Sequence, residues 1–325
     1  MTVLRAATSR APRLLLEATL RPVQGHRFQP TGFPDLGPAA YQLPDGTPML
    51  LVESPQSVAN RLEAVCWDSA ADDWVPPLRG LPYIRVLWGG RPITNSVLEA
   101  HRLNSRYILR DGKGDFLARL QPELRELDFG PVDIRRLARV VFKYDPNALI
   151  HGVFLARKEI AGGRLRLQRL LSGFIEAADV RPVESGGVKN DRVDPTGNTR
   201  LGYGNVPFHR TEYVARTITA YFNLDLATLR AYDLGPEAEE LVIALSLWKV
   251  QQFLATGLRL RTACDLVCQD LKVVAPEGFA VPSAGNLAEM LPGLIAACRG
   301  LFASPPVTEV QWEPEKAGAA QEDEE

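Results

Sequence analysis

Alternation of apolar and polar residues marks the first extended segments of the chain. Residues 13–23 read RLLLEATLRPV and predict a strand, and Met49–Glu53 predicts a second, short one. Between them, residues 25–48 are rich in glycine and proline and predict a loop. Ser54 is followed by proline, which pairs an N-cap with the residue favoured at the first helical position. We therefore expect a helix over residues 55–64.

The next segments predict a strand and a helix that carries basic side chains. Tyr83–Trp88 is apolar and predicts a strand after a polar connection over residues 72–82. Ser96-Val97-Leu98-Glu99 has the spacing of a capping box, so a helix is expected to begin there. Its basic residues would be His101, Arg102 and Arg106. Asn95 and Glu99 are expected to cap it.

The strongest helical period lies further along. Apolar residues spaced i, i+3, i+4, i+7 predict a helix over residues 131–142, and this helix would carry a basic stripe of Arg135, Arg139 and Lys143. Later segments are predicted from the same patterns: strands at Leu149–Leu155 and Arg164–Ala177, a strand or a helix at Tyr213–Phe222, helices at 236–254 and 286–302, and a disordered tail from about Pro314.

Composition adds bounds to this picture. The 325 residues suggest about two domains, and 46% hydrophobic with 23% charged residues is the balance of a globular protein. No apolar run reaches the length of a membrane span, about 18 residues. The net charge of −2 taken alone argues against a nucleic-acid binder. Segments 1–84, 85–216 and 217–325 carry −1, +8 and −9, however. This separation of charge indicates a polyanionic partner or head-to-tail assembly. The alternative is a chance variation in charge between segments of the chain.

The cysteines and the N-terminal residues indicate the cellular compartment of the protein. Four cysteines without nearby histidines or paired C-x-x-C spacing predict buried thiols in a reducing cytoplasm and no zinc site. Residues Met1–Leu16 hold three arginines and no acid, which resembles a transit peptide only faintly. We expect an exposed arm followed by the first strand, and a cytoplasmic protein without membrane contact.

Residues 181–211 are the most informative segment. RPVESGGVKNDRVDPTGNTRLGYGNVPFHRT has five glycines, three prolines and no apolar period. A loop of this length is usually functional or disordered. Its cations suit phosphates and its aromatic residues suit bases, and Asp194–Asn198 has the composition of a hairpin tip. The alternatives are a grip on single-stranded nucleic acid, in the form of an extended hairpin, and a flexible insertion without a ligand.

Other motifs give little support for an enzyme. Gly202-Tyr203-Gly204 lacks the third glycine of a dinucleotide fingerprint, and Gly186-Gly187-Val188-Lys189 lacks the spacing of a Walker loop. The four histidines are scattered, and a single histidine is more often a packed or surface residue than a ligand. No metal, cofactor or catalytic residue is expected.

Several longer runs together resemble one family. They are Asn60-Arg61-Leu62-Glu63, residues 95–105, His151-Gly152-Val153-Phe154, residues 185–191 and residues 202–210. They resemble the backbone subunit of type I-U (renamed I-G) CRISPR effector complexes, within the RAMP superfamily. The resemblance covers about residues 13–222.

The resemblance implies an α+β fold, in which an RRM-like (ferredoxin-like) palm at residues 1–222 carries large insertions and a thumb at about 181–211. Residues 223–313 would form a helical part packed on the palm, and residues 314–325 a disordered acidic tail. The function implied is a non-catalytic scaffold of a type I interference complex. Several copies would form a helical filament on the crRNA spacer and present it to target DNA, together with other effector subunits.

Residue roles follow from chemistry within that frame. Phosphate contacts are expected from Lys189, Arg192, Arg200 and Arg210, and wedging or stacking from Val188, Tyr203, Phe208 and His209. Further RNA contacts are expected from Asn60, Arg61, His101, Arg102, Arg106, Asn190 and Asn205. For the helical arginines the alternative is a solvated salt bridge. The stripe of Arg135, Arg139 and Lys143 would face target DNA.

Two other functions remain open. Some RAMP subunits of other CRISPR types cut bound RNA with a loop aspartate, and Asp191 and Asp194 are the acids in a comparable place. A metal-dependent RNA endonuclease is therefore the alternative. A third possibility is a protein-only filament that needs no RNA.

Overall fold

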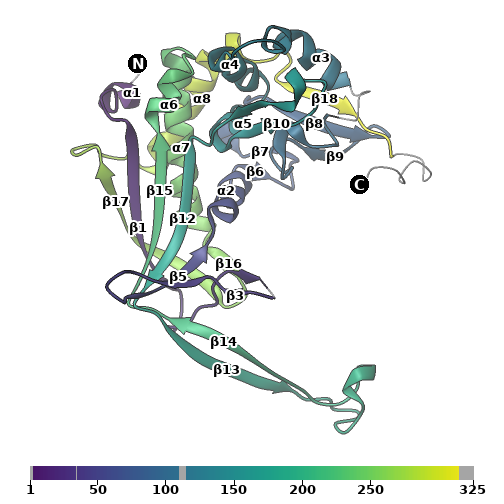
Figure 1. The fold of residues 1–325 in the computed structure, drawn as a ribbon, viewed down its shortest axis with the longest axis vertical. Helices are drawn as coiled ribbons and strands as arrows, with labels where there is room; N and C mark the ends of the chain where they lie inside the picture. Colours follow the sequence, from purple (N-terminus) through teal and green to yellow (C-terminus); the bar gives the residue numbers. More distant parts are fainter. Residues whose placement is uncertain (1–2, 34, 110–114, 315–325) are drawn as a thin grey trace.

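A seven-stranded antiparallel sheet is the largest element of the protein. The computed structural model describes residues 3–33, 35–109 and 115–314. In spatial order the strands of the sheet are β16 (Arg259–Arg261), β17 (Cys264–Ala275), β1 (Arg13–Pro22), β15 (Thr217–Asp225), β12 (Leu171–Ala178), β5 (Pro48–Glu53) and β4 (Ala40–Gln42). The long central strands run side by side in Figure 1.

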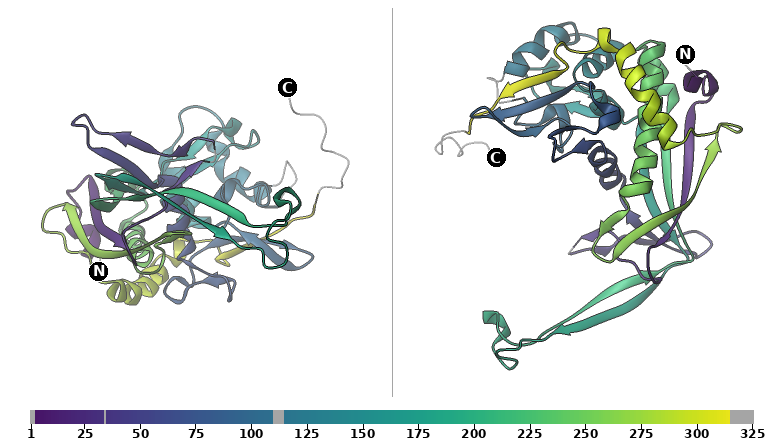
Figure 2. Two further views of the ribbon diagram at one scale, coloured as in Figure 1. Left: turned by 90° about the horizontal axis from the view of Figure 1, so that it is seen from below. Right: turned by 180° about the vertical axis from the view of Figure 1, so that it is seen from behind.

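One face of this sheet is apolar and is covered by helices. Along β1, every second residue from Leu14 to Leu20 is buried, and β12 and β15 repeat this alternation. Helix α7 (Pro236–Thr256) packs on the apolar face, where Phe222 and Phe253 meet edge-to-face. Helices α8 (Ala284–Ala297) and α2 (Pro55–Ala64) pack against α7 in turn (Figure 2). As a result, α7 is buried along most of its length.

A second body of structure lies beside the long sheet (Figure 1). Its three-stranded sheet has the order β18 (Val307–Gln311), β8 (Tyr83–Trp88) and β9 (Arg91–Asn95), with β18 parallel to β8. Helices α3 (Asp115–Leu124), α4 (Ile134–Tyr144) and α5 (Pro146–His151) accompany it. The small ribbons of the chain are β2 (Gly32–Phe33) with β3 (Gly37–Pro38), β6 (Trp67–Asp68) with β7 (Asp73–Trp74), and β10 (Val153–Leu155) with β11 (Leu165–Leu167).

A long hairpin projects from the sheet. Strands β13 (Arg181–Lys189) and β14 (Val206–Val214) pair antiparallel along their whole length and leave the body between β12 and β15 (Figure 1). Nine residues at about 3.3 Å each give an arm of about 30 Å. The prediction of an extended hairpin within residues 181–211 is confirmed.

Helices with clear caps match their predictions closely. The Ser54 hydroxyl accepts a hydrogen bond from the Ser57 amide, as expected for the start of α2. α7 begins at the predicted proline. α4 begins at Ile134 rather than at residue 131, because the Asp133 carboxylate accepts from the amides of Arg135 and Arg136. Residues 213–222, left open between strand and helix, belong to the two strands β14 and β15.

The prediction of a helix that begins at Ser96 is wrong. Residues 96–101 form turns, followed by one 3-10 turn at Arg102–Asn104. The Asn95 side-chain oxygen accepts from the amides of Val97 and Leu98, which bends the chain into a turn. The Glu99 carboxylate accepts from Thr94 and Ser105 hydroxyls instead of capping a helix.

The strands expected at 149–155 and 164–177 also need correction. Residues 149–151 end helix α5, because Asp145 caps that helix and a proline stands at its first position. The positive φ of 82° at Gly152 then ends the helix, and only Val153–Leu155 is extended. The later segment divides into β11 and β12, with residues 168–170 between them.

The C-terminal part is not purely helical. Residues 223–313 contain α6 (Leu226–Ala231), α7 and α8, but they also supply β16 and β17 to the long sheet and β18 to the second one. The sheet therefore crosses the boundary expected at residue 222. Two register shifts between β17 and β1 interrupt the alternation that would have marked β17 as a strand. The tail expected at 314–325 lies outside the described residues except for Pro314.

The N-terminal segment is docked rather than free. Residues Val3–Ala7 form helix α1, and the buried Glu240 carboxylate on α7 accepts hydrogen bonds from the amides of Leu4 and Arg5. The prediction of an exposed arm for this segment is therefore wrong where the structure describes it.

Cys66, Cys264 and Cys298 are buried free thiols, as predicted, and Cys268 is half-buried. In the described part of the chain, no helix has the length and hydropathy needed to cross a membrane.

Candidate nucleic-acid interface

The projecting hairpin presents different side chains on its two faces. Gly187 pairs with Phe208 and Lys189 with Val206, and residues directly opposite share a face. Lys189, Phe208 and Arg210 therefore share one face, and Val188 and His209 share the other. The Phe208 ring lies over Gly187, 3.3 Å from where a Cβ would stand, yet it remains 56% exposed. The hairpin thus combines a cation and an exposed aromatic ring on one side.

The tip of the hairpin holds the remaining candidates. Arg192, Arg200, Asn190 and Tyr203 are exposed, and Val193 and Leu201 beside them are exposed apolar residues. Lys189, Arg192 and Arg200 have no ion-pair partner within the described residues. Unpaired cations next to exposed apolar and aromatic groups are suited to the phosphates and bases of a single strand.

Asp191 and Asn205 organise the tip rather than project from it. The two carboxylate oxygens of Asp191 accept from the amides of Val193, Asp194 and Gly204, and these bonds lower the pKa of Asp191. The Asn205 side chain accepts from the Asp191 amide at 2.8 Å. A Cβ at Gly204 would lie 2.3 Å from the Gly197 carbonyl, so glycine permits a close approach within the tip itself.

Arg210 belongs partly to the base of the hairpin. Its guanidinium donates to the Glu212 carboxylate at 2.8 Å, and Arg27 forms a second ion pair with the same carboxylate at 3.2 Å. Glu212 is buried, so it needs these partners. Next to it, Tyr213 pairs with Phe28 through two backbone hydrogen bonds of 2.9 Å. Arg210 thus anchors the arm as well as facing outward.

A groove on the body brings together two of the runs that resemble the family, residues 95–105 and residues 151–154. It has a volume of about 720 Å³ and lies between the start of α2, the turn at residues 100–104 and the β10–β11 ribbon. Gln56, His101, His151, Phe154, Arg166 and Arg169 contribute to its lining. None of the described residues that line it is acidic. The groove is therefore suited to an anionic ligand.

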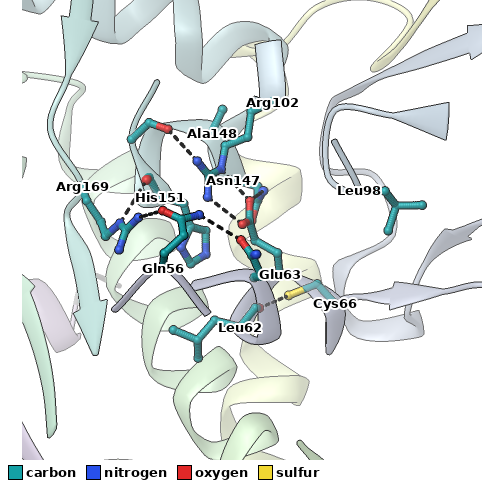
Figure 3. Close-up of polar contacts among 12 residues, drawn as sticks. Gln56, Leu62, Glu63, Cys66, Leu98, Arg102, Asn147, Ala148, His151 and Arg169 are labelled. Carbon is teal, nitrogen blue, oxygen red and sulfur yellow. Dashed lines mark hydrogen bonds and ion pairs between the residues drawn. The ribbon is translucent and has the colours of Figure 1, made fainter. Parts of the chain in front are cut away.

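Arg102 lies in the floor of this groove and is buried. Its guanidinium forms two hydrogen bonds of 2.7 Å with the Glu63 carboxylate and one of 3.2 Å with the Gly152 carbonyl (Figure 3). Each of the three guanidinium nitrogens donates a hydrogen bond within the fold, and this geometry favours a structural role over the expected phosphate contact. The two residues come from motifs almost forty positions apart in the chain.

A buried polar network continues below Arg102. Asn147 donates to Glu63 at 2.8 Å, and Lys249 on α7 donates to Asn147. The Lys249 amino group also lies 2.9 Å from Nε2 of His151. Burial, followed by the charges of Lys249, Arg102 and Arg169, holds the pKa of His151 well below its ordinary value. His151 is therefore a neutral ring at physiological pH.

Arg169 joins the groove to α2. Its guanidinium donates to the Pro55 carbonyl and to the Gln56 side chain, each at 2.9 Å, and more weakly to the His151 carbonyl (Figure 3). These bonds fix the start of α2 relative to β11. Arg169 was not among the predicted site residues, because no local pattern marks it.

The two candidates on α2 differ in their surroundings. Asn60 is exposed and its side-chain oxygen accepts from Gln56 at 3.1 Å. Arg61 is half-buried, forms an ion pair of 2.9 Å with the buried Glu53 and donates to the Leu260 carbonyl. His101 is exposed on the groove, and Arg106 is exposed beyond it. The structure thus places Asn60, His101 and Arg106 at the surface and engages Arg61 in the fold.

The basic stripe of α4 is paired with acidic side chains. Arg139 and Arg135 lie 3.1 and 3.9 Å from the Asp233 carboxylate, and Lys143 lies 2.8 Å from Glu123. These three cations lie on a different part of the body from the groove, whose lining does not include them. In this structure Arg135, Arg139 and Lys143 are arranged as salt-bridged side chains, which is the alternative stated for the helical arginines.

Comparison with known proteins identifies the family. The sequence profile described as CRISPR-associated protein GSU0053 matches residues 14–182, just over half of the 325-residue chain. The chain belongs to this family of CRISPR-associated proteins. No curated protein matches it.

Two solved structures are similar at low identity. A chain of "CRISPR RNA-guided surveillance complex, pre-nicking" aligns with 85% of this chain and 80% of its own length, at 14% identity and a TM-score of 0.44. Csc2 of Thermofilum pendens aligns with 89% of this chain and 76% of its own length, at 12% identity and a TM-score of 0.32.

Proposed function

We propose that this chain is a non-catalytic RNA-binding subunit of a type I CRISPR interference complex. Several copies stack head-to-tail along the spacer part of the CRISPR RNA and present it to target DNA. One observation carries the proposal: in a member of a CRISPR-associated family, a hairpin of about 30 Å presents exposed aromatic rings and cations that have no ion-pair partner in the described part of the chain. Such an arm grips a backbone and separates bases without reading their sequence.

The proposed palm is RRM-like. Four adjacent strands of the central sheet carry this proposal: numbered one to four in chain order they are β1, β12, β15 and β17, and their spatial order is four, one, three, two with all pairs antiparallel. This is the arrangement of a ferredoxin-like β-α-β-β-α-β unit. The hairpin is then an insertion between the second and third strands, and α7 is the second helix.

The separation of charge supports a head-to-tail filament. The basic excess falls on residues 85–216, which include the hairpin and most of the groove, whereas residues 217–325 are acidic. A subunit with separated signs holds RNA on one surface while its acidic surface faces the cations of the next copy. Other effector subunits would cap the ends of such a filament.

A shortened hairpin tests the proposal. Residues 187–208 are replaced by Asn-Gly, which closes the Gly186–His209 pair with a two-residue turn. We expect an unchanged thermal unfolding of the body, an RNA affinity lower by about tenfold or more, and shorter assemblies on spacer-length RNA. Affinity is measured by fluorescence anisotropy and assembly by sedimentation. Phe129→Ala, which removes a 94% exposed ring outside the hairpin, is the matched control.

Two results would overturn the proposal. Regular cleavage of complementary RNA with Mg²⁺ or Mn²⁺, lost in Asp194→Ala, would establish an endonuclease instead. Purified protein that forms filaments with an absorbance ratio typical of protein alone, and that does not bind added RNA, would establish a protein-only assembly.

A further inference from the structure

The ribbon β10–β11 and the ring of His151 form a site that the hairpin does not explain. Phe154 and Arg166 stand directly opposite each other on the ribbon, both exposed, while their neighbours Val153, Leu155, Leu165 and Leu167 are buried. Phe154 is 53% exposed, and both side chains line the 720 Å³ groove. An exposed phenylalanine beside an arginine is a platform for a flat, anionic ligand.

The His151 ring holds a donor of known position within the wall of the groove. His151 lines the groove but is only 2% exposed. A lysine ammonium has donors and no acceptor, so Nε2 of His151 must accept from Lys249. The proton of the neutral ring then resides on Nδ1. Within the described residues, Nδ1 is buried and has no hydrogen-bond partner.

A buried donor without a partner is costly in a protein and points to a missing acceptor. A chain of buried polar contacts holds this donor in place. Lys249 is fully buried and is itself held by Asn147, and Asn147 is held by the Glu63–Arg102 pair. The network thus fixes the tautomer and the position of His151 from below.

We propose that this groove is a subsite for one unpaired nucleotide of the bound RNA. Its base stacks on Phe154, and its phosphate lies against Arg166 and His101. Nδ1 of His151 is covered in the free protein, so an oxygen or nitrogen acceptor of the nucleotide takes its hydrogen only after the covering side chains shift on binding. The inference rests on the proposed RNA-binding function and adds a second grip to the hairpin. Arg102, Asn147 and Lys249 are positioning residues that act through His151.

The size and charge of the groove favour this occupant. Its volume is in the range of sites that enclose a small ligand, about 300–1,000 Å³, and is too small for a folded protein partner. Within the described residues, Arg166 and His101 form no ion pair, so both are available to a phosphate. The absence of acid from the described lining leaves no like-charge repulsion.

Photocrosslinking with binding measurements tests the subsite on the full chain. RNA of spacer length that carries 4-thiouridine is crosslinked to the protein, and the attached peptides are identified by mass spectrometry. We expect crosslinks on a peptide that contains Phe154 as well as on the hairpin. Phe154→Ala should abolish the first set and lower the affinity by about tenfold, whereas Phe129→Ala should change neither.

Substitution of His151 separates the donor from the packing. Asparagine places an amide NH₂ near the position of Nδ1, and leucine places no donor there; both lose the contact with Lys249. We expect His151→Asn to bind RNA within about threefold of the wild type and His151→Leu about tenfold more weakly, compared at equal folded fraction. Equal affinities for the two variants, with wild-type crosslinks absent from the Phe154 peptide, overturn the subsite.

The two proposals fail in different ways. A wild-type protein that does not bind RNA overturns the proposed function and the subsite together. RNA binding that depends on the hairpin but is unchanged in Phe154→Ala and His151→Leu overturns the subsite alone.

Discussion

Asp191 and Gly204 face each other across the tip of the hairpin, where the Asp191 carboxylate accepts a hydrogen bond of 2.9 Å from the Gly204 amide. The same carboxylate accepts from two further amides, those of Val193 and Asp194. One side chain therefore satisfies three backbone donors in an exposed segment, and the shape of the tip depends on it.

Removal of this carboxylate should loosen the tip and leave the body intact. We expect Asp191→Ala to be cleaved by trypsin after Arg192 and Arg200 several-fold faster than the wild type, with an unchanged thermal unfolding temperature. Asp194→Ala is the matched control, because within the described residues the Asp194 carboxylate accepts a single hydrogen bond, of 3.3 Å, from the Thr196 hydroxyl. Equal cleavage rates in the three proteins would contradict the role of Asp191.

RNA binding should weaken steeply with salt. Phosphate contacts release counterions, so the logarithm of the binding constant falls linearly with the logarithm of the salt concentration. We expect Lys189→Ala and Arg192→Ala each to reduce that slope by about one-half to one unit and to weaken binding to all sequences alike. Anisotropy titrations at several salt concentrations give the slope. Thr199→Ala, an uncharged change in the tip, should leave it unchanged.

The Glu63–Arg102 pair should contribute to stability. Both residues are buried, and the loss of Arg102 removes the ion pair and two hydrogen bonds of 2.7 Å from the Glu63 carboxylate, which keeps a hydrogen bond from the neutral Asn147 side chain. We expect Arg102→Met to lower the free energy of unfolding by about 3–5 kcal/mol, measured by urea denaturation. The double variant Glu63→Gln/Arg102→Met should recover part of this loss. A variant Arg102→Met of normal stability that binds RNA more weakly would instead support direct contact with RNA.

Asp145 should give the fold a characteristic pH dependence. Burial raises its pKa from 3.8 to about 6, so the folded state holds this proton more tightly than the unfolded chain. Its ionised form therefore opposes folding, by a cost that grows as the pH rises from 3.8 to 6 and reaches about 3 kcal/mol above that window.

Asp145→Asn isolates this effect. Asparagine retains an oxygen that accepts from the Ala148 amide, the bond that caps α5, but it does not titrate. We expect the unfolding free energy of the variant, relative to the wild type, to rise with pH through the same window and to level off at neutral pH. Urea denaturation at a series of pH values measures the difference. A difference that is constant with pH would show that the carboxyl group stays ionised in the fold at little cost.

Elements with strong local signals were predictable from the sequence. β1, α2 and α7 have clear alternation or a serine or proline at the start, and their observed bounds differ little from the predicted ones. β17 was missed because two register shifts break its alternation. The turn after Asn95 replaced a helix because a side-chain oxygen competes with the helical hydrogen bonds, and the capping-box spacing does not report that competition.

The candidate site was predictable where it is local. The composition of residues 181–211 predicted an arm with cations and aromatic rings, and the structure has that arm. The groove was not predictable as a unit, because Phe154 and Arg166 become neighbours only through the pairing of β10 with β11. The alternation of Leu165, Arg166 and Leu167 was a usable signal for the outward direction of Arg166. The partner of His151, Lys249, lies almost a hundred residues away.

Both ends of the hairpin enter neighbouring strands of the central sheet, β12 and β15. The arm can therefore lengthen or shorten by whole cross-strand pairs, at about 3.4 Å a pair, without a change in the strands that hold it. The length of the hairpin can therefore change without affecting the folding of the sheet. Relatives of this chain are free to vary the span of the arm by small insertions, and an engineer has the same freedom to set how far each copy extends toward the next.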